Sequence, residues 1–242
     1  MDRERAPRVV FVPGFMQRGD AWRPVAERIA TSYRTAVLDH RADTFEGRLD
    51  EIAAEAARDA VLVGYSMGGR LALHAALRRP RALRALVLVG ASAGIEDEGL
   101  REERRSADER LADWMEGRSI EEIVERWERV PALASQSREL REALRPGRLS
   151  HDPAALASLL RTAGQGTLPP VWDRLPGLPL PVLAVAGEGD DVYVAAAYRM
   201  AELLPRGAAR LVPGAGHSPQ LERPDAFAAI LEKFVDAMDF GS

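Results

Sequence analysis

The sequence predicts an α/β protein with a mostly parallel sheet, helices on both faces of that sheet, and an inserted helical lid. Two observations lead to this prediction. Short apolar runs of strand length alternate with helical patterns along most of the chain, as is typical of parallel sheets. Between residues 95 and 160 the alternation stops, and the chain is charged, rich in arginine and glutamate, and free of strand-like runs. A chain of 242 residues suits one such domain with an insertion.

Each expected element is an apolar run or a helical pattern bounded by turn residues. The expected strands are Arg8–Val12, Arg34–Leu38, Ala60–Val63, Leu83–Val89, Pro181–Ala186 and Ala208–Val212. The expected core helices are Asp20–Ala30, Gly47–Arg58, Met67–Arg78, Val194–Leu204 and Ser218–Met238, with Asp20 as the cap of the first. We assign residues 1–94 and 171–242 to the core and 95–170 to the lid. The Gly- and Pro-rich stretch 164–181 is the expected hinge.

The composition argues against several classes of protein. The net charge of -4 is mild and its signs are interspersed, so nucleic acid and anionic membranes are not expected partners. Without cysteine there is no disulfide or thiolate metal site, and nothing in the sequence requires a metal or organic cofactor. The charged N-terminus, Met1–Arg5, does not resemble a signal peptide, and no apolar run is of membrane-spanning length. We expect a cytoplasmic protein, and the sequence indicates no oligomeric state.

The most informative motif is the string Gly64-Tyr65-Ser66-Met67-Gly68, a G-x-S-x-G sequence between an expected strand and an expected helix. In this setting the serine occupies a strained turn, and side chains in place of the two glycines would clash with the neighbouring strand and helix. The serine hydroxyl then lies above the sheet, beside a helix N-terminus that favours negative charge. The alternative is a chance G-x-S-x-G on a loop, which the flanking elements disfavour. Ser66 is the predicted nucleophile.

A serine of this kind needs a histidine as its base. His217 is predicted for that role because its Gly-rich loop joins the last strand to the last helix, from which an imidazole can reach Ser66. His74 is expected to pack inside its own helix against a neighbouring element. His40 and His151 lie in polar loops and are expected to face solvent.

The acid of a triad should follow a strand between the serine and the histidine in the chain. The loop after Pro181–Ala186 provides Asp190, which we predict holds the imidazole in the right tautomer, with Asp191 and Glu188 as alternatives. The same residues are also good turn and helix-cap formers, and both roles can hold at once. The chain order of serine, aspartate and histidine is that of the α/β-hydrolase arrangement.

An oxyanion hole requires two backbone amides that point at developing negative charge. Met67, which follows the nucleophile, is expected to supply one of them. The loop after the first strand supplies the other, where Gly14 allows a sharp turn and Phe15 offers its amide while its ring lines the pocket. Phe15 as an ordinary core residue is the competing interpretation.

Several strings together resemble one family. The chain resembles the α/β-hydrolase superfamily over its whole length. Within that superfamily it is most similar to the 2-succinyl-6-hydroxy-2,4-cyclohexadiene-1-carboxylate synthases of menaquinone biosynthesis. The matching strings are Gly64–Arg70, Gly90–Ile95, Arg104 with Asp108, Arg126–Pro131, Gly164–Trp172, Gly187–Asp190 and Gly214–His217. The elbow and the last two loops are common to the superfamily, whereas Arg70 and the lid strings narrow the choice.

The resemblance implies a lyase reaction that eliminates pyruvate from 2-succinyl-5-enolpyruvyl-6-hydroxy-3-cyclohexene-1-carboxylate, with the triad serine as the base. A substrate with three carboxylates needs fixed cations, and guanidinium binds carboxylate in a bidentate manner. Arg70 lies one helical turn after Ser66 and can face the same pocket. The residues that match the family's substrate-binding positions are Arg70, Arg104 and Arg145, with the pocket aromatics Tyr65 and Trp127. In so arginine-rich a segment, a solvated lid face is the alternative for each arginine.

Three departures from the family pattern weaken the substrate assignment. The oxyanion loop reads Pro13-Gly14-Phe15 where the family usually has His-Gly-Phe, and Leu38–Ala42 lacks the Leu-Pro-Gly-His-Gly string of many superfamily members. Asp191-Val192-Tyr193 replaces a more usual Lys-Phe after the acid. A serine hydrolase of esters, thioesters or carbon–carbon bonds, with the same triad, is the second hypothesis. A non-catalytic ligand receptor is the third, and the complete triad disfavours it.

Overall fold

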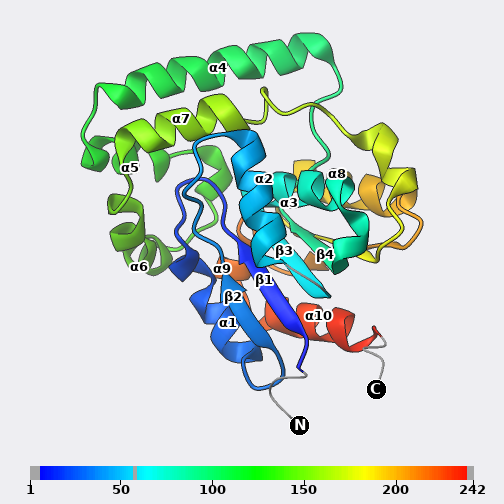
Figure 1. Cartoon of the computed structure of the whole chain (residues 1–242). Helices are drawn as coiled ribbons and strands as arrows, with labels where there is room; N and C mark the ends of the chain where they lie inside the picture. The colour runs from blue at the N-terminus through cyan, green and yellow to red at the C-terminus, as the bar shows by residue number, and fades with distance from the viewer. Residues whose placement is uncertain (1–5, 57–58, 239–242) are drawn as a thin grey trace.

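The computed structural model describes residues 6–56 and 59–238 and contains a six-stranded sheet with the order β2-β1-β3-β4-β5-β6 (Figure 1). Every pair of neighbouring strands is parallel. The strands are β1 (Arg8–Val12), β2 (Arg34–Val37), β3 (Ala60–Tyr65), β4 (Leu83–Val89), β5 (Val182–Gly187) and β6 (Gly207–Val212). Their bounds agree with the predicted ones to within two residues. The predicted fold class is confirmed.

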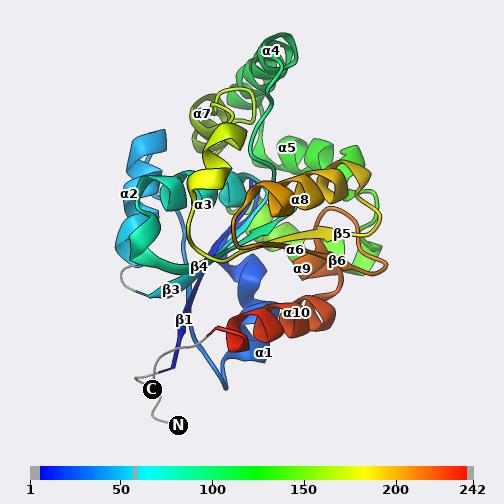
Figure 2. The same cartoon turned by 90° about the vertical axis from the view of Figure 1, so that its right-hand side faces the viewer.

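Helices cover both faces of this sheet (Figure 2). The core helices are α1 (Arg23–Ile29), α2 (Phe45–Glu55), α3 (Met67–Arg78), α8 (Asp191–Leu203), the short α9 (Pro219–Glu222) and α10 (Pro224–Asp236). One face packs against α1 and α10, and the other packs against α2, α3 and α8. Because the central strands β3 and β5 are covered on both faces, each of their residues is buried and apolar or glycine.

The lid lies between β4 and β5 in the chain. Its helices are α4 (Glu98–Glu116), α5 (Ile120–Trp127), α6 (Arg138–Leu149) and α7 (Pro153–Ala163). They sit above the carboxyl ends of the strands in Figure 1. Each of these helices begins at a serine or aspartate whose side chain accepts a hydrogen bond from an amide of the first turn. The sequence pattern of the lid, with no strand between residues 95 and 160, is thus matched by the described structure.

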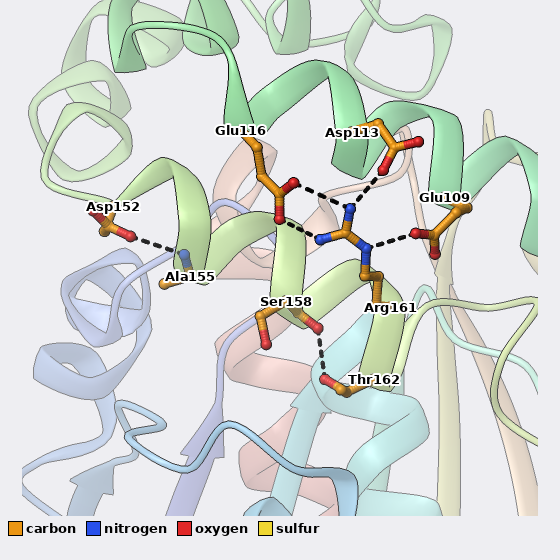
Figure 3. A network of polar contacts seen from close by, with 8 residues as sticks. All are labelled: Glu109, Asp113, Glu116, Asp152, Ala155, Ser158, Arg161 and Thr162. Carbon is orange, nitrogen blue, oxygen red and sulfur yellow. Dashed lines mark hydrogen bonds and ion pairs between the residues drawn. The ribbon is translucent and has the colours of Figure 1, made fainter.

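A single guanidinium group joins two helices of the lid, α4 and α7 (Figure 3). Arg161 of α7 donates to Glu109 at 2.7 Å, to Asp113 at 2.6 Å and to Glu116. These acids are spaced four and three residues apart on α4, so they share one face of that helix. At the start of α7, Asp152 accepts from an amide of the first turn at 2.9 Å. Both helices therefore form one ion-paired unit.

The two ends of the lid meet beside the sheet. The Val171 amide donates to the Ala93 carbonyl at 2.8 Å, and the Trp172 indole donates to the Gly94 carbonyl at 2.8 Å. The expected hinge also contains a 3₁₀ segment, Trp172–Gly177. These contacts lie close to the expected boundary, and the division of the chain at residues 94 and 171 stays a prediction.

The bounds of several helices differ from the prediction. Asp20 does not cap the first helix, because it lies inside a 3₁₀ turn and α1 begins only at Arg23, with a proline in its first turn. The predicted last helix is two helices, α9 and α10, because Pro224 has no N–H with which to continue the first. Helix α8 begins at Asp191 rather than at the predicted Val194.

The second core helix begins earlier than predicted, at Phe45, because the Thr44 hydroxyl caps it by accepting from an amide at 3.1 Å. Its predicted end at Arg58 and the charged N-terminus Met1–Arg5 lie outside the described residues. Within the described part of the chain, no helix is both long and apolar enough to cross a membrane.

Candidate active site

The G-x-S-x-G string forms a sharp turn between β3 and α3. Ser66 has φ +50° and ψ -113°, a region that non-glycine residues seldom adopt, and its amide donates to the Val89 carbonyl at 2.8 Å. A Cβ on Gly64 would lie 2.5 Å from the Gly68 carbonyl oxygen, and one on Gly68 would lie 2.3 Å from the Pro13 carbonyl oxygen. Only glycine fits at either position. The crowding predicted from the sequence is present, and it holds the serine in its strained turn.

His217 lies within hydrogen-bonding distance of both Ser66 and Asp190. His217 Nε2 is 3.2 Å from Ser66 Oγ, and His217 Nδ1 is 2.7 Å from Asp190 Oδ2. Because an ionised carboxylate only accepts, Nδ1 carries the proton and donates to Asp190, which leaves Nε2 free to accept the serine proton. This is the arrangement that activates a serine hydroxyl.

The two alternative acids lie elsewhere. Glu188 accepts from the Gly214 amide at 3.2 Å, and Asp191 is exposed in the first turn of α8. Each of them therefore supports a loop or a helix start, and the described structure pairs neither with His217.

The His217 loop is held by a neighbouring carboxylate. Glu222 accepts from the Gly216 amide at 2.8 Å and from the Ser218 amide at 3.0 Å, so it binds the backbone on both sides of the base. The aromatic ring of Tyr193 packs against the imidazole in a tilted arrangement, at 4.6 Å between centroids and an interplanar angle of 44°. The imidazole is thus fixed through its ring, its Nδ1 and its backbone.

Two amides are suited to an oxyanion hole beside Ser66. Met67 is the first residue of α3, where amides have no partner inside the helix. Phe15 lies in the turn after β1, and its amide donates to no other described residue. The Phe15 ring meets Trp127 of the lid edge-on, at 5.2 Å between centroids, and it also belongs to the buried core. The pocket and core interpretations of Phe15 therefore hold together.

A cavity of about 320 Å³ opens above Ser66, between the core and the lid. Core and lid residues both line it, among them Phe15, Tyr65, Ser66, Met67, Arg70, Arg104, Trp127, Gln136, Arg148, Tyr193 and His217. All but one of the residues predicted from the sequence to bind substrate or to form the oxyanion hole are in this group. Most of the cavity wall is apolar or aromatic, which leaves the arginines as its conspicuous cations.

Arg70 brings a charge into the cavity without a carboxylate partner. Its side chain is 6% exposed, its Nε has no hydrogen-bond partner, and no ion pair involves it among the described residues. Burial lowers the pKa of its guanidinium. A buried cation that the protein does not neutralise is costly, so this group is poised to bind an anion.

The two lid arginines of the cavity are each paired with an acid. Arg104 donates to Asp108 at 2.8 Å. Arg148 is 4% exposed and donates to Glu128 at 3.1 Å and to Gln136 Oε1 at 3.0 Å. Their remaining N–H groups are available to a ligand because a guanidinium carries five donors.

Arg145, the third predicted arginine, does not line the cavity. It donates to Glu128 at 2.7 Å and is more than one third exposed. Arg148, three residues later on α6, occupies the cavity wall in its place, and the sequence analysis missed it. Spacing alone identifies both as near neighbours on one helix face, but it does not tell which of them is buried.

The other histidines have structural environments. His74 is buried and meets Phe45 edge-on at 5.3 Å, as predicted, and burial lowers its pKa to about 4. The expectation that His40 and His151 face solvent is wrong. His40 binds Glu51 at 2.9 Å, and burial lowers the pKa of both imidazoles. No group of three His, Cys, Asp or Glu side chains suited to a metal ion occurs in the described ranges.

Comparison with known proteins identifies the family. A model of the alpha/beta hydrolase family matches residues 9–230. The protein belongs to the alpha/beta hydrolase family. This α/β hydrolase combines the strained elbow, the hydrogen-bonded Ser66, His217 and Asp190, and a helical lid above the sheet.

Relatives within the family share one name. The α/β hydrolase is 36% identical over 180 residues to a Bacillus subtilis (strain 168) protein provisionally named 2-succinyl-6-hydroxy-2,4-cyclohexadiene-1-carboxylate synthase, a match covering 73% of this chain and 66% of that protein. It is 29% identical over 245 residues to the synthase of that name from Serratia proteamaculans (strain 568), covering 95% and 93% of the two chains.

Two solved structures superpose on nearly the whole chain. MenH from S. aureus superposes with a TM-score of 0.91 at 29% identity, over 96% of this chain and 94% of that one. A thermophilic esterase from Thermogutta terrifontis superposes with a TM-score of 0.80 at 24% identity, over 96% and 90% of the two chains, and shares the fold alone.

Proposed function

We propose that the protein eliminates pyruvate from 2-succinyl-5-enolpyruvyl-6-hydroxy-3-cyclohexene-1-carboxylate, the lyase reaction of menaquinone biosynthesis. The observation that carries the proposal is the cavity lining, in which Arg70, Arg104 and Arg148 surround the same space as Ser66 and His217. This substrate has three carboxylates, and guanidinium is the side chain best suited to bind them. The names of the relatives agree with this substrate.

Ser66 acts as the base through His217. As the imidazole Nε2 takes the hydroxyl proton, the Ser66 oxygen removes the ring proton on C2, which the neighbouring succinyl carbonyl acidifies. The electrons form the C2–C3 double bond, move the C3–C4 double bond to C4–C5, and break the bond from C5 to oxygen. Pyruvate leaves as its enolate and takes the proton from His217. Ser66 regains a proton from the substrate, so the enzyme ends unchanged.

The backbone amides of Phe15 and Met67 serve the same step. Negative charge moves onto the succinyl carbonyl oxygen when the ring proton leaves, and Phe15 and Met67, which line the cavity with Ser66, would donate to that oxygen through their amides. An acyl-enzyme is not part of this reaction, because Ser66 removes a proton and does not attack carbon.

A paired assay tests the proposal. The enolpyruvyl substrate, generated by the preceding pathway enzyme, should release pyruvate rapidly, and short-chain nitrophenyl esters should be cleaved slowly. Ser66→Ala should lose about a thousandfold or more of pyruvate release, because the base is gone. Rapid ester turnover without pyruvate release would refute the lyase assignment.

The two neighbouring arginines of α6 provide a matched pair. Arg148→Ala should lower kcat/KM for pyruvate release by about tenfold or more, because it removes a buried cation from the cavity wall. Arg145→Ala removes a guanidinium bound to the same Glu128 but outside the cavity, and should change it by about twofold or less. Equal losses in the two variants would show that Arg145, to which the resemblance pointed, matters as much as Arg148, and that lining the cavity does not identify the functional arginine of this helix.

A serine hydrolase is the second candidate, favoured by one observation. The triad distances and the two amides suit a tetrahedral intermediate as well as an enolate. A covalent acyl-enzyme on Ser66, detected by mass spectrometry after reaction with an ester, distinguishes it from the lyase.

For the protein as a whole, we propose a small-molecule substrate, a cytoplasmic location and no nucleic-acid or membrane partner.

A further inference from the structure

The buried side-chain amide of Gln136 connects the lid to the residues that adjoin His217 and Ser66 in the chain. Gln136 precedes α6 and is 2% exposed. Its Oε1 accepts from Arg148 at 3.0 Å, and its Nε2 donates to Ser218 Oγ at 3.1 Å. Because a guanidinium has donors only, the amide must direct its oxygen toward Arg148 and its nitrogen toward Ser218. The orientation of the Gln136 side chain is therefore fixed by its partners.

The hydrogen bonds continue from this amide to two residues that adjoin the triad, Ser218 and Tyr65. Ser218 is fully buried and follows His217 directly in the chain. Its hydroxyl also lies 2.8 Å from the hydroxyl of Tyr65, the residue before Ser66. One continuous chain of hydrogen bonds thus runs from the cavity arginine to the neighbours of the base and of the nucleophile.

The backbone packs as closely as the side chains. A Cβ on Gly216 would lie 2.0 Å from the hydroxyl oxygen of Ser135, so this lid residue rests directly on the loop of the base. Glu222 holds the same loop through the amides of Gly216 and Ser218. The loop of His217 is therefore fixed between its own carboxylate and residues 135–136 of the lid.

We propose that Gln136 is a positioning residue that sets the guanidinium of Arg148 and the imidazole of His217 relative to each other. An elimination needs the substrate carboxylate and the base at a fixed separation, and an error of about 1 Å can cost a hundredfold in rate. The amide meets this need because it satisfies a substrate-binding arginine and the base loop at once. The inference rests on the proposed function for the role of Arg148, but not for the placement of His217.

Three variants separate the two bonds of the amide. Gln136→Met keeps the length of the side chain and removes both hydrogen bonds. Gln136→Glu keeps an acceptor for Arg148 and removes the donor to Ser218, whereas Ser218→Ala removes that acceptor and leaves the bond to Arg148. Ile123→Val is the control, because it loosens a fully buried position of the lid that neither lines the cavity nor joins this chain.

The expected result is a division between KM and kcat. Gln136→Met should raise KM and lower kcat, with kcat/KM reduced by about tenfold or more. Ser218→Ala should lower kcat and leave KM close to that of the wild type, whereas Gln136→Glu should also raise KM because its carboxylate neutralises Arg148. The losses in kcat of Gln136→Met and Ser218→Ala should be less than additive in the double variant, because both changes break the Gln136–Ser218 bond and only Ser218→Ala also removes the partner of Tyr65. Additive losses, or the same KM and kcat changes in Ile123→Val, would overturn the proposal.

A second readout does not depend on the reaction. The ¹⁵N signals of His217, assigned by their absence in His217→Ala, should move in Gln136→Met and in Ser218→Ala but not in Ile123→Val. Unchanged signals in both variants would overturn the placement of the base by Gln136. A wild-type protein that releases no pyruvate while these signals move would refute the proposed function and leave the positioning role standing.

Discussion

Arg161 and Arg70 present the same chemical group in opposite surroundings. Arg161 binds three acids on the outer seam of the lid, and its hydrogen bonds to them raise the pKa of its guanidinium (Figure 3). Arg70, at the floor of the cavity, has no ion-pair partner among the described residues, and burial lowers its pKa. In a chain with 33 basic residues, only one of which is lysine, residue type alone does not separate these two roles.

The difference shows how a functional arginine is recognised in such a protein. A cation neutralised by the chain itself has little charge left for a ligand, whereas a buried cation without a partner costs stability unless a ligand neutralises it. Arg104 and Arg148 lie between these extremes, since each binds one acid and still lines the cavity. The four predictions below test this distinction.

The largest effect is expected from Arg70→Met. Removal of the unpaired cation should lower kcat/KM for pyruvate release by about a hundredfold, the loss expected for a buried charge-assisted contact with a carboxylate. The same change should raise the free energy of unfolding by about 1 kcal/mol, because a buried unpaired charge is replaced by an apolar side chain. Kinetics and urea unfolding measure the two effects. A large fall in stability would show that Arg70 is a structural residue.

The next effect is a loss of stability in mild acid. The pKa of His74 is lowered to about 4 by burial and by the nearby Arg174 and Arg70, so the unfolded state binds the extra proton below its usual pKa of about 6.5. Stability should therefore fall between about pH 6.5 and 4, by at most about 1.4 kcal/mol per pH unit. His74→Leu should lessen the loss measured by urea unfolding at pH 7 and pH 5.

Arg70→Met should lessen the same acid loss by a smaller amount, because it removes one of the charges that oppose protonation of His74. An unchanged pH dependence in this variant would show that the Arg70 charge is already neutralised in solution, contrary to the comparison above.

A smaller effect is expected from Tyr193→Phe. Tyr193 packs against His217 and lines the cavity with Arg70, and its hydroxyl has no hydrogen-bond partner in the described part of the chain. The phenylalanine keeps the ring and removes one donor, so KM should rise by about threefold while kcat stays within about twofold. Steady-state kinetics test this, with Tyr193→Ala as the variant that also removes the ring packed against His217 and should lower kcat.

The smallest effect on activity is expected from Arg161→Met. The change breaks the ion pairs of the lid seam and leaves the cavity lining intact, so kcat/KM should stay within about twofold of the wild type. Hydrogen exchange in α4 and α7 should become faster because their joint contact is weaker. A loss of activity as large as that of Arg70→Met would remove the distinction between the two arginines.

Local patterns were sufficient for the catalytic half of the site. The elbow glycines, the loop of Asp190 and the loop of His217 could be recognised because each depends on a strand end and a backbone shape that few residues permit. The break before α10 is also a local effect, since it follows from Pro224, although the helical pattern around it hid the signal.

The lid half of the site depended on packing. Arg145 and Arg148 lie three residues apart on one helix, and only the docking of α6 on the core buries the second and leaves the first at the surface. Gln136 gives no signal at all in the sequence, because its two partners come from a distant part of the chain and from the next helix. The burial of His40 beside Glu51 was missed for the same reason.

The sequence by itself determined the fold class and the family resemblance, and it singled out the residues proposed as nucleophile, base and acid, because these rest on periodicity and on steric limits of neighbouring residues. The tertiary structure alone decided which guanidinium groups have no acidic partner and can bind a ligand, and which are neutralised by acids of the chain. That outcome depends on distances between groups far apart in the chain and on the water excluded around them, and no local pattern encodes either.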